Sequence, residues 1–206
     1  MRRIIFPVCI GFVALTACSP ETSGVASPAN TPSSSSVSST SPEVPGPGVP
    51  KVESPIDTDQ FASAPCTAMT ESQVMELFGR SVTPKPDLQG PAGPTCTWDP
   101  ADGSGASINL IFSKVDRLGL TSVYQAKDST YKFFQVLESV GDYPAVAYGT
   151  SDHRADGSCS IAVGTSDRNT VDIAVTQSRE KIGKSDPCAV AQTVGAKVLA
   201  TLKGGN

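Results

Sequence analysis

Four cysteines between residues 66 and 188 constrain the fold of the chain more than any other feature. Cys66, Cys96, Cys159 and Cys188 form an even set, and no two of them are arranged as Cys-x-x-Cys. The missing spacing argues against a redox pair or a zinc knuckle. In an exported domain, an even set predicts two disulfides, for which the sequence alone allows three pairings.

The N-terminus predicts that the chain is exported. Arg2 and Arg3 precede an apolar run from Ile4 to Leu15, and Thr16-Ala17 leads directly into Cys18. Such a run rises about 18 Å as a helix, too short for a hydrocarbon core of about 30 Å, and its length is typical of a secretory signal. The layout is that of a bacterial lipoprotein signal. We therefore expect residues 1–17 to be a signal peptide that is removed.

Acylation of Cys18 is the expected consequence of this pattern. Two or three acyl chains hold a protein firmly on a bilayer, whereas one chain binds only marginally. The expected location is the cell membrane, with a lipid anchor on the extracytoplasmic face. The alternative is an ordinary secreted protein, or an uncleaved anchor, in which the cysteine is coincidental.

A change of composition marks off a tether. Ser19–Gln60 contains 11 Ser, 8 Pro and 4 Thr in 42 residues and has no aromatic residue. That composition buries too little apolar surface to offset the entropy lost on ordering. We expect residues 18–60 to form an acylated, disordered tether and residues 61–206 to form one globular domain. O-glycosylation of the tether is a hypothesis that its Ser, Thr and Pro content leaves open.

The first predicted helix has a recognisable beginning and end. Thr70 and Gln73 fit a capping box, and Gly79 fits a left-handed residue after a helix over 71–78. A second, short helix is expected over 120–126.

The last predicted helix extends nearly to the C-terminus. Asp186 is expected to cap it, and Pro187 suits its first position. Its apolar stripe consists of Cys188, Ala191, Val194, Val198 and Leu202.

Most of the remaining domain predicts strands. The segments with alternating or apolar character are 95–99, 108–112, 133–138, 145–148, 159–163 and 171–175. One-sided alternation is typical of an antiparallel sheet with one covered face. The expected fold class is therefore α+β, a single domain with a mainly antiparallel sheet of five or six strands, two or three covering helices and two disulfides.

Of the three cysteine pairings, we favour Cys66–Cys96 and Cys159–Cys188. The first ties the entry of the first helix to the first predicted hairpin. The second clamps the last helix to the sheet, because both of its cysteines lie on predicted buried faces.

The sequence contains no recognisable catalytic constellation. It lacks a Gly-x-Ser-x-Gly elbow, a phosphate-binding glycine loop and a His-x-x-x-His pair. His153 is the single histidine and lies in a polar segment, so it is more simply a solvated side chain than a metal ligand or a base. Glu138 and Asp142 resemble paired carboxylates, but polar residues at a strand end are the simpler interpretation. We expect no enzyme activity, no metal and no cofactor.

Binding is the more promising class of function. The chain has 16 basic and 20 acidic residues without a block of like charge, which argues against nucleic acid as a partner. Tyr143, Pro144 and Trp98 are the candidate contacts for a ligand or a protein partner. The competing interpretation is that Pro144 stiffens a strand entry with Tyr143 packed on the sheet edge, and that Trp98 fills the core.

Several short motifs, taken in their order along the chain, resemble a family of actinobacterial, mycobacterial-type secreted lipoproteins classed as a domain of unknown function. They are Pro65-Cys66, Cys96-Thr97-Trp98, Gly141-Asp142-Tyr143-Pro144-Ala145-Val146, an isolated Cys159, and Asp186-Pro187-Cys188, together with the lipobox that ends at Cys18. Asp142 is an extra residue where the family pattern has Gly-x-Pro-Ala. The resemblance implies a lipid-anchored envelope protein with paired cysteines, and it implies no activity.

Three functions follow as hypotheses. The leading one is a non-catalytic binding or interaction domain that contacts an unknown envelope protein or an apolar small molecule. The first alternative is a lipid or glycolipid carrier with an apolar pocket enclosed by the sheet and the last helix. The second alternative is an envelope hydrolase.

Overall fold

The computed structural model describes residues 42–204. The predictions for the signal peptide over 1–17, for acylation of Cys18 and for the first part of the tether lie outside the described residues. In the part that is described, no helix combines the length and the apolar character that a membrane crossing requires.

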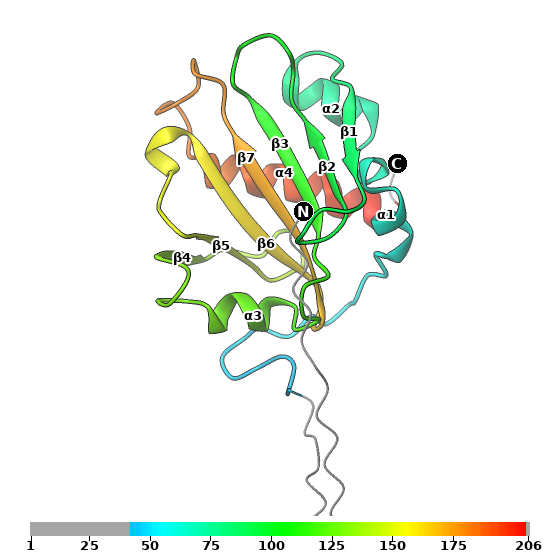
Figure 1. Cartoon of the computed structure of the whole chain (residues 1–206), viewed down its shortest axis with the longest axis vertical. Coiled ribbons are helices and arrows are strands. Elements are labelled where there is room, and N and C mark those ends of the chain that lie inside the picture. The colour runs from blue at the N-terminus through cyan, green and yellow to red at the C-terminus, as the bar shows by residue number, and fades with distance from the viewer. Residues whose placement is uncertain (1–41, 205–206) are drawn as a thin grey trace, which may run out of the picture. The chain divides into compact units, whose positions relative to one another are not determined.

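The domain is built on one antiparallel sheet of seven strands in the order β1-β2-β3-β7-β6-β5-β4 (Figure 1). The strands are β1 (Pro84–Asp87), β2 (Thr95–Trp98), β3 (Ser107–Phe112), β4 (Phe133–Val136), β5 (Ala145–Gly149), β6 (Ser158–Ser166) and β7 (Asn169–Thr176). The helices are α1 (Asp59–Ser63), α2 (Glu71–Phe78), α3 (Leu120–Gln125) and α4 (Pro187–Leu202), with short 3₁₀ turns η1 (Pro65–Ala68) and η2 (Arg154–Asp156). The architecture agrees with the predicted α+β class.

The predicted count of five or six strands is wrong, because the sheet has seven. The strand that the sequence did not reveal is β1, whose sequence is Pro-Lys-Pro-Asp. Proline cannot donate to a β-ladder, so a segment with Pro84 and Pro86 does not look like a strand. It is tolerated here because β1 lies at the edge of the sheet and pairs with β2 alone. The described residues also contain four α-helices, one more than the expected maximum; the additional α1 has five residues.

Helix α4 covers one face of the sheet and forms the main core with it. Asp186 caps its N-terminus by accepting a hydrogen bond from Cys188 N at 2.9 Å, as predicted. All five residues of the predicted stripe are buried. Gly195 lets the helix approach closely, since a Cβ there would lie 3.1 Å from Val140 and 3.2 Å from Ile173. The space between α4 and the sheet is therefore filled by side chains.

Helix α2 has the predicted capping box at its start. The Thr70 hydroxyl accepts a hydrogen bond from Gln73 N at 3.3 Å, and the Gln73 side chain accepts one from Thr70 N at 2.8 Å. Gly79 has φ of 70° and ends the helix in the left-handed region. The Gln73 amide also donates to Lys197 O at 3.0 Å, which fixes α2 against α4.

The second face of the sheet is partly covered. A smaller apolar cluster joins α3 to β5 and β6 through Leu120, Val123, Val146 and Ala162, with Val49 and several aromatic residues packed around it. This cluster buries Val146 and Ala162, two side chains on the face that one-sided alternation assigns to solvent.

The packed domain begins before the predicted boundary at residue 61. Gly46 N donates to Thr121 Oγ1 at 3.0 Å, and Val52 N donates to Asp167 Oδ1 at 2.9 Å. Val52 is 4% exposed, because its side chain contributes to the main core. Residues 46–58 thus form a strap along the domain, despite a composition that resembles the tether.

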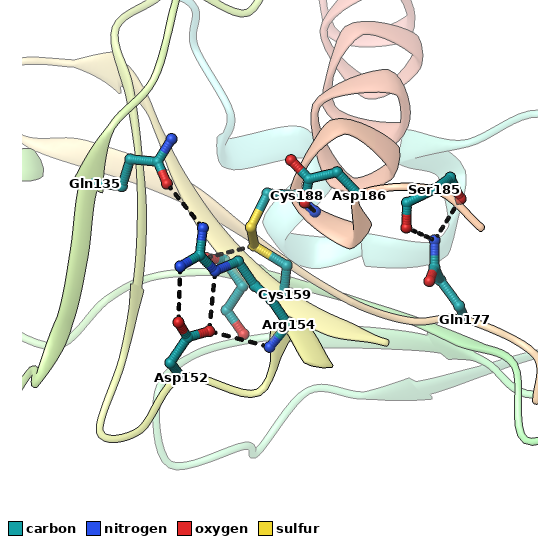
Figure 2. Close-up of a disulfide and its surroundings, with 9 residues drawn as sticks. Gln135, Asp152, Arg154, Cys159, Gln177, Ser185, Asp186 and Cys188 are labelled. Carbon is teal, nitrogen blue, oxygen red and sulfur yellow. Dashed lines mark hydrogen bonds and ion pairs between the residues drawn. A yellow bond between two sulfur atoms is a disulfide. The ribbon is translucent and has the colours of Figure 1, made fainter. Parts of the chain in front are cut away.

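The two disulfides join Cys66 to Cys96 and Cys159 to Cys188, with Cα–Cα distances of 5.1 Å in both. These are the pairings that we favoured from the sequence. The first connects η1 to β2, and the second connects β6 to the first turn of α4 (Figure 2).

Candidate functional site

A groove of about 840 Å³ opens at one end of the sheet. It lies where β3 begins and β7 ends, between α2, α4 and the loop of residues 177–186 that joins β7 to α4. In Figure 1 this is the upper end of the strands, and the strap of residues 46–58 follows the opposite end. The groove is therefore remote from the point at which the chain enters the domain.

One wall of the groove is apolar. Leu77 and Phe78 come from the last turn of α2, and Val190 comes from the first half of α4. All three side chains are half-buried and pack on the main core, so part of each faces the groove. The floor is closed by buried core residues, namely Ile108, Val175 and Val194.

The opposite wall carries charged and hydroxyl groups. Arg80 and Asp102 form an ion pair across the groove mouth, with Nη1 and Oδ2 separated by 3.3 Å. Hydrogen bonds from Ser104 hold the pKa of Asp102 below its ordinary value, and Arg80 adds to this effect. The Asp102 carboxylate is thus already satisfied by this chain.

Arg179 lies on the same wall but is paired differently. Its backbone N–H donates to Ser104 O at 3.0 Å, and its Nη1 donates to Gly103 O at 3.1 Å. Its stem passes 3.9 Å from the position that a Cβ of Gly105 would take. Among residues 42–204, none of the ion pairs includes Arg179 or its neighbours Glu180 and Lys181. The guanidinium group is therefore oriented by the Gly103 carbonyl alone, and most of its donors stay available.

Gln177 fastens the loop that forms this wall. Its Nε2 donates to Ser185 Oγ at 2.8 Å and to Ser185 O at 3.2 Å (Figure 2). The side chain is 7% exposed, and its Oε1 is a buried acceptor without a hydrogen-bond partner in the described structure. The buried amide oxygen without a partner lowers the stability of the folded domain, and the hydrogen bonds of Nε2 to Ser185 offset part of this loss.

A shallower depression of about 590 Å³ lies on the other side of the same loop, next to the Cys159–Cys188 disulfide. Its arginine is paired within the chain, whereas Lys184 forms no ion pair among residues 42–204. Arg154 forms an ion pair with Asp152 at 2.7 Å and donates to Gln135 Oε1 at 3.3 Å (Figure 2). Its guanidinium also lies 4.5 Å from the Phe133 ring centroid. Hydrogen bonds from Arg154 lower the pKa of Asp152 to about 2. These contacts stabilise the loop after β5 and leave no unpaired arginine there.

The outer face of the sheet contains a second unusual group, the Asp172 carboxyl. Asp172 is in the middle of β7, and its Oδ1 is buried without a hydrogen-bond partner within the described residues. Desolvation raises its pKa to about 7, and the hydroxyls of Thr170 and Tyr148 counteract only part of this shift. Burial also raises the pKa of Tyr148, whose ring packs edge-to-face on Tyr131 at 4.8 Å. Asp172 lines neither of the two depressions described above.

The three residues that the sequence suggested as ligand or partner contacts are buried or half-buried in the structure. Trp98 is 1% exposed and belongs to the main core. Tyr143 is 3% exposed, and its hydroxyl donates to Ser54 O at 2.8 Å, so it holds the strap. Pro144 is half-buried, and its carbonyl accepts a hydrogen bond from Gly164 N at 2.9 Å. Trp98 and Tyr143 are therefore not available as ligand contacts, because packing covers both rings. The prediction for Pro144 stays a prediction.

The polar residues that the sequence singled out are not brought together. His153 is exposed, and its Nδ1 lies 3.2 Å from Asp156 Oδ2 within a 3₁₀ turn. Glu138 and Asp142 are exposed, and Asp142 occupies a tight turn between Val140 and Tyr143. Within the described part of the chain, no three His, Cys, Asp or Glu residues are grouped as metal ligands.

The groove residues had no local signal in the sequence. Arg80, Asp102 and Arg179 come from three separate loops, and each loop looks like an ordinary polar connection. Asp102 and Arg179 meet because the β2–β3 hairpin and the end of β7 are neighbours in the sheet, and Arg80 reaches Asp102 from the loop after α2.

Comparison with known proteins supplies the family and no activity. No curated protein and no solved structure gives a significant match to the chain. A family model matches residues 13–201, a range that includes all seven strands and nearly all of α4. The chain therefore belongs to the family DUF3558, whose members are proteins of unknown function.

Proposed function

We propose that this protein is a lipid-anchored, extracytoplasmic binding protein whose domain holds a ligand or a partner in the groove between α2, α4 and the 177–186 loop. The observation that carries the proposal is the groove itself, in which a half-buried apolar wall faces a wall of charged groups. Its volume falls in the range of about 300–1,000 Å³ that is usual for small-molecule sites.

The cellular location is proposed from two observations. Two disulfides in one domain are typical of proteins that fold in an oxidising compartment, outside the cytoplasm. The lipoprotein-type signal that ends at Cys18 supports the same compartment and adds the membrane anchor.

The packing of α4 bears on the alternative of a lipid carrier. Gly195 and the stripe of α4 sit directly on the sheet, so a lipid would not be enclosed between them. Any apolar ligand would instead lie in the groove, with one side open to solvent. We therefore favour reversible binding at the groove over enclosure of a whole lipid.

Photocrosslinking in the producing cells tests this proposal. A photoreactive phenylalanine analogue at Val190 reports on the groove, and the same analogue at Val115 is the matched control. Val115 is an apolar side chain that is 69% exposed and does not line the groove. We expect a discrete crosslinked species from position 190 that is missing from position 115. Equal crosslinking from both positions, or none from position 190, would contradict the proposed function.

A further inference from the structure

We infer that the groove recognises a small amphiphile in which an apolar chain is joined to a single anionic group, a carboxylate or a phosphate. This inference rests on the proposed function of the groove and adds the chemical class of its ligand. The assignment comes from the difference between the two arginines on the polar wall.

Arg80 and Arg179 have different roles in the groove. Arg80 is neutralised by Asp102 at 3.3 Å, so this pair contributes little net charge to a ligand. The Arg179 guanidinium is held by one backbone carbonyl, Gly103 O, which accepts from Nη1, while Ser104 O accepts from the Arg179 backbone N–H. The guanidinium has no carboxylate partner in the described structure. A guanidinium that is pre-positioned and unpaired is suited to a planar carboxylate or to a phosphate, to which it donates two parallel hydrogen bonds.

The other charges of the wall favour an anion as well. Lys181 and Glu180 flank Arg179, and neither forms an ion pair within residues 42–204. The unpaired groups therefore sum to one positive charge. A cationic ligand would meet this surplus with repulsion, while an anion is attracted to it.

The apolar wall selects the second half of the ligand. Leu77, Phe78 and Val190 face the charged wall from α2 and α4. Covering them with an alkyl chain removes apolar surface from water on both partners, at about 25 cal/mol per Å². Core residues close the floor, so the alkyl chain of the ligand lies along the groove and does not enter the protein core. The anionic end then meets Arg179 at the rim.

The test is competitive displacement of a fluorescent polyene fatty acid from the chain that starts at residue 18 and carries Cys18→Ser. This change removes the acylation site and leaves the domain intact. The competitors share one alkyl chain length: dodecanoate, dodecyl phosphate, dodecanol and dodecylamine. The ionic ones are used below their critical micelle concentrations and the alcohol below its solubility limit. We expect dodecanoate and dodecyl phosphate to bind about tenfold more tightly than dodecanol, and dodecylamine to bind most weakly. Comparing dodecanoate with dodecyl phosphate distinguishes the two sources of the anion.

Two variants locate the anion. Arg179→Gln is expected to weaken dodecanoate binding about tenfold and to leave dodecanol within about twofold. Lys184→Gln is the matched control, because Lys184 is a cation of the same loop that lines the other depression. A larger effect of Lys184→Gln than of Arg179→Gln, or equal binding of all four competitors, would overturn the inference. Thermal unfolding of each variant shows that the domain is intact.

The failure of this inference is distinguishable from failure of the proposed function. If the Val190 crosslinker captures a protein segment while no amphiphile displaces the probe, the ligand class is wrong and the groove is still the binding site. If neither assay gives a signal, both proposals fall.

Discussion

Replacing Asp172 with Asn tests the reasoning about the outer face of the sheet quantitatively. Desolvation raises the pKa of Asp172 from the ordinary 3.8 to about 7 in the folded domain. The folded state therefore binds this proton more tightly than the unfolded state does. Its contribution to stability is fully present below about pH 4, falls as the pH rises towards 7, and is lost above 7.

The size of the effect follows from the two pKa values. Each pKa unit corresponds to about 1.4 kcal/mol, so ionising Asp172 costs the folded state up to about 4 kcal/mol at pH 8. The Asn side chain has nearly the same shape and cannot ionise. We expect Asp172→Asn to be more stable than the parent at pH 8 by about 2–4 kcal/mol, and close to the parent or slightly less stable at pH 4.5.

Urea unfolding at both pH values, followed by tryptophan fluorescence, measures this difference. Trp98 is buried in the core and is the single tryptophan of the chain, so its emission reports on unfolding of the domain. Asp142→Asn is the control, because Asp142 is an exposed carboxylate in a turn. If the stability difference between Asp172→Asn and the parent is the same at pH 4.5 and pH 8, the assignment of a raised pKa to Asp172 is refuted.

Three further predictions concern the scaffold. Replacing Cys159 and Cys188 together with Ala opens a cross-link between residues 29 positions apart and should lower the free energy of unfolding by about 3–4 kcal/mol, measured by urea denaturation. Thr70→Ala removes the N-cap of α2 and should lower the free energy of unfolding by about 1 kcal/mol. Thr67→Ala, at an exposed position, should lower it much less, and equal losses from the two variants would contradict the capping box. Val52→Ala should cost about 2 kcal/mol in the same assay, and a loss below about 0.5 kcal/mol would show that the strap does not contribute to the core.

The main elements follow from sequence because they depend on one-sided burial. Cys159, Ile161 and Val163 alternate towards the core in β6, and the stripe of α4 packs on the same face. Caps such as Thr70 are also local, so residues within one turn define them. Strand β1 could not be predicted from the sequence, because its prolines are tolerated only at a sheet edge. Which strand lies at the edge is decided by the whole sheet and not by the local sequence.

The site was less predictable for a physical reason. The aromatic residues that looked available for binding, Trp98 and Tyr143, are consumed by the core and by the strap. The raised pKa of Asp172 comes from desolvation beside side chains such as Tyr148 of another strand, which no local pattern reveals. The orientation of the Arg179 guanidinium depends on the Gly103 carbonyl of the β2–β3 hairpin, which lies 76 positions earlier in the sequence. Such long-range neighbours carry no periodic signal.

The most direct test of the groove as the ligand site is a two-dimensional NMR titration of the isotopically labelled Cys18→Ser chain with dodecanoate. Our account predicts that the perturbed amide signals concentrate at Phe78, Arg179 and Val190, around the end of β7 and the start of α4. Perturbations centred instead on the outer face near Thr97 and Ala174, or no saturable perturbation at all, would contradict it.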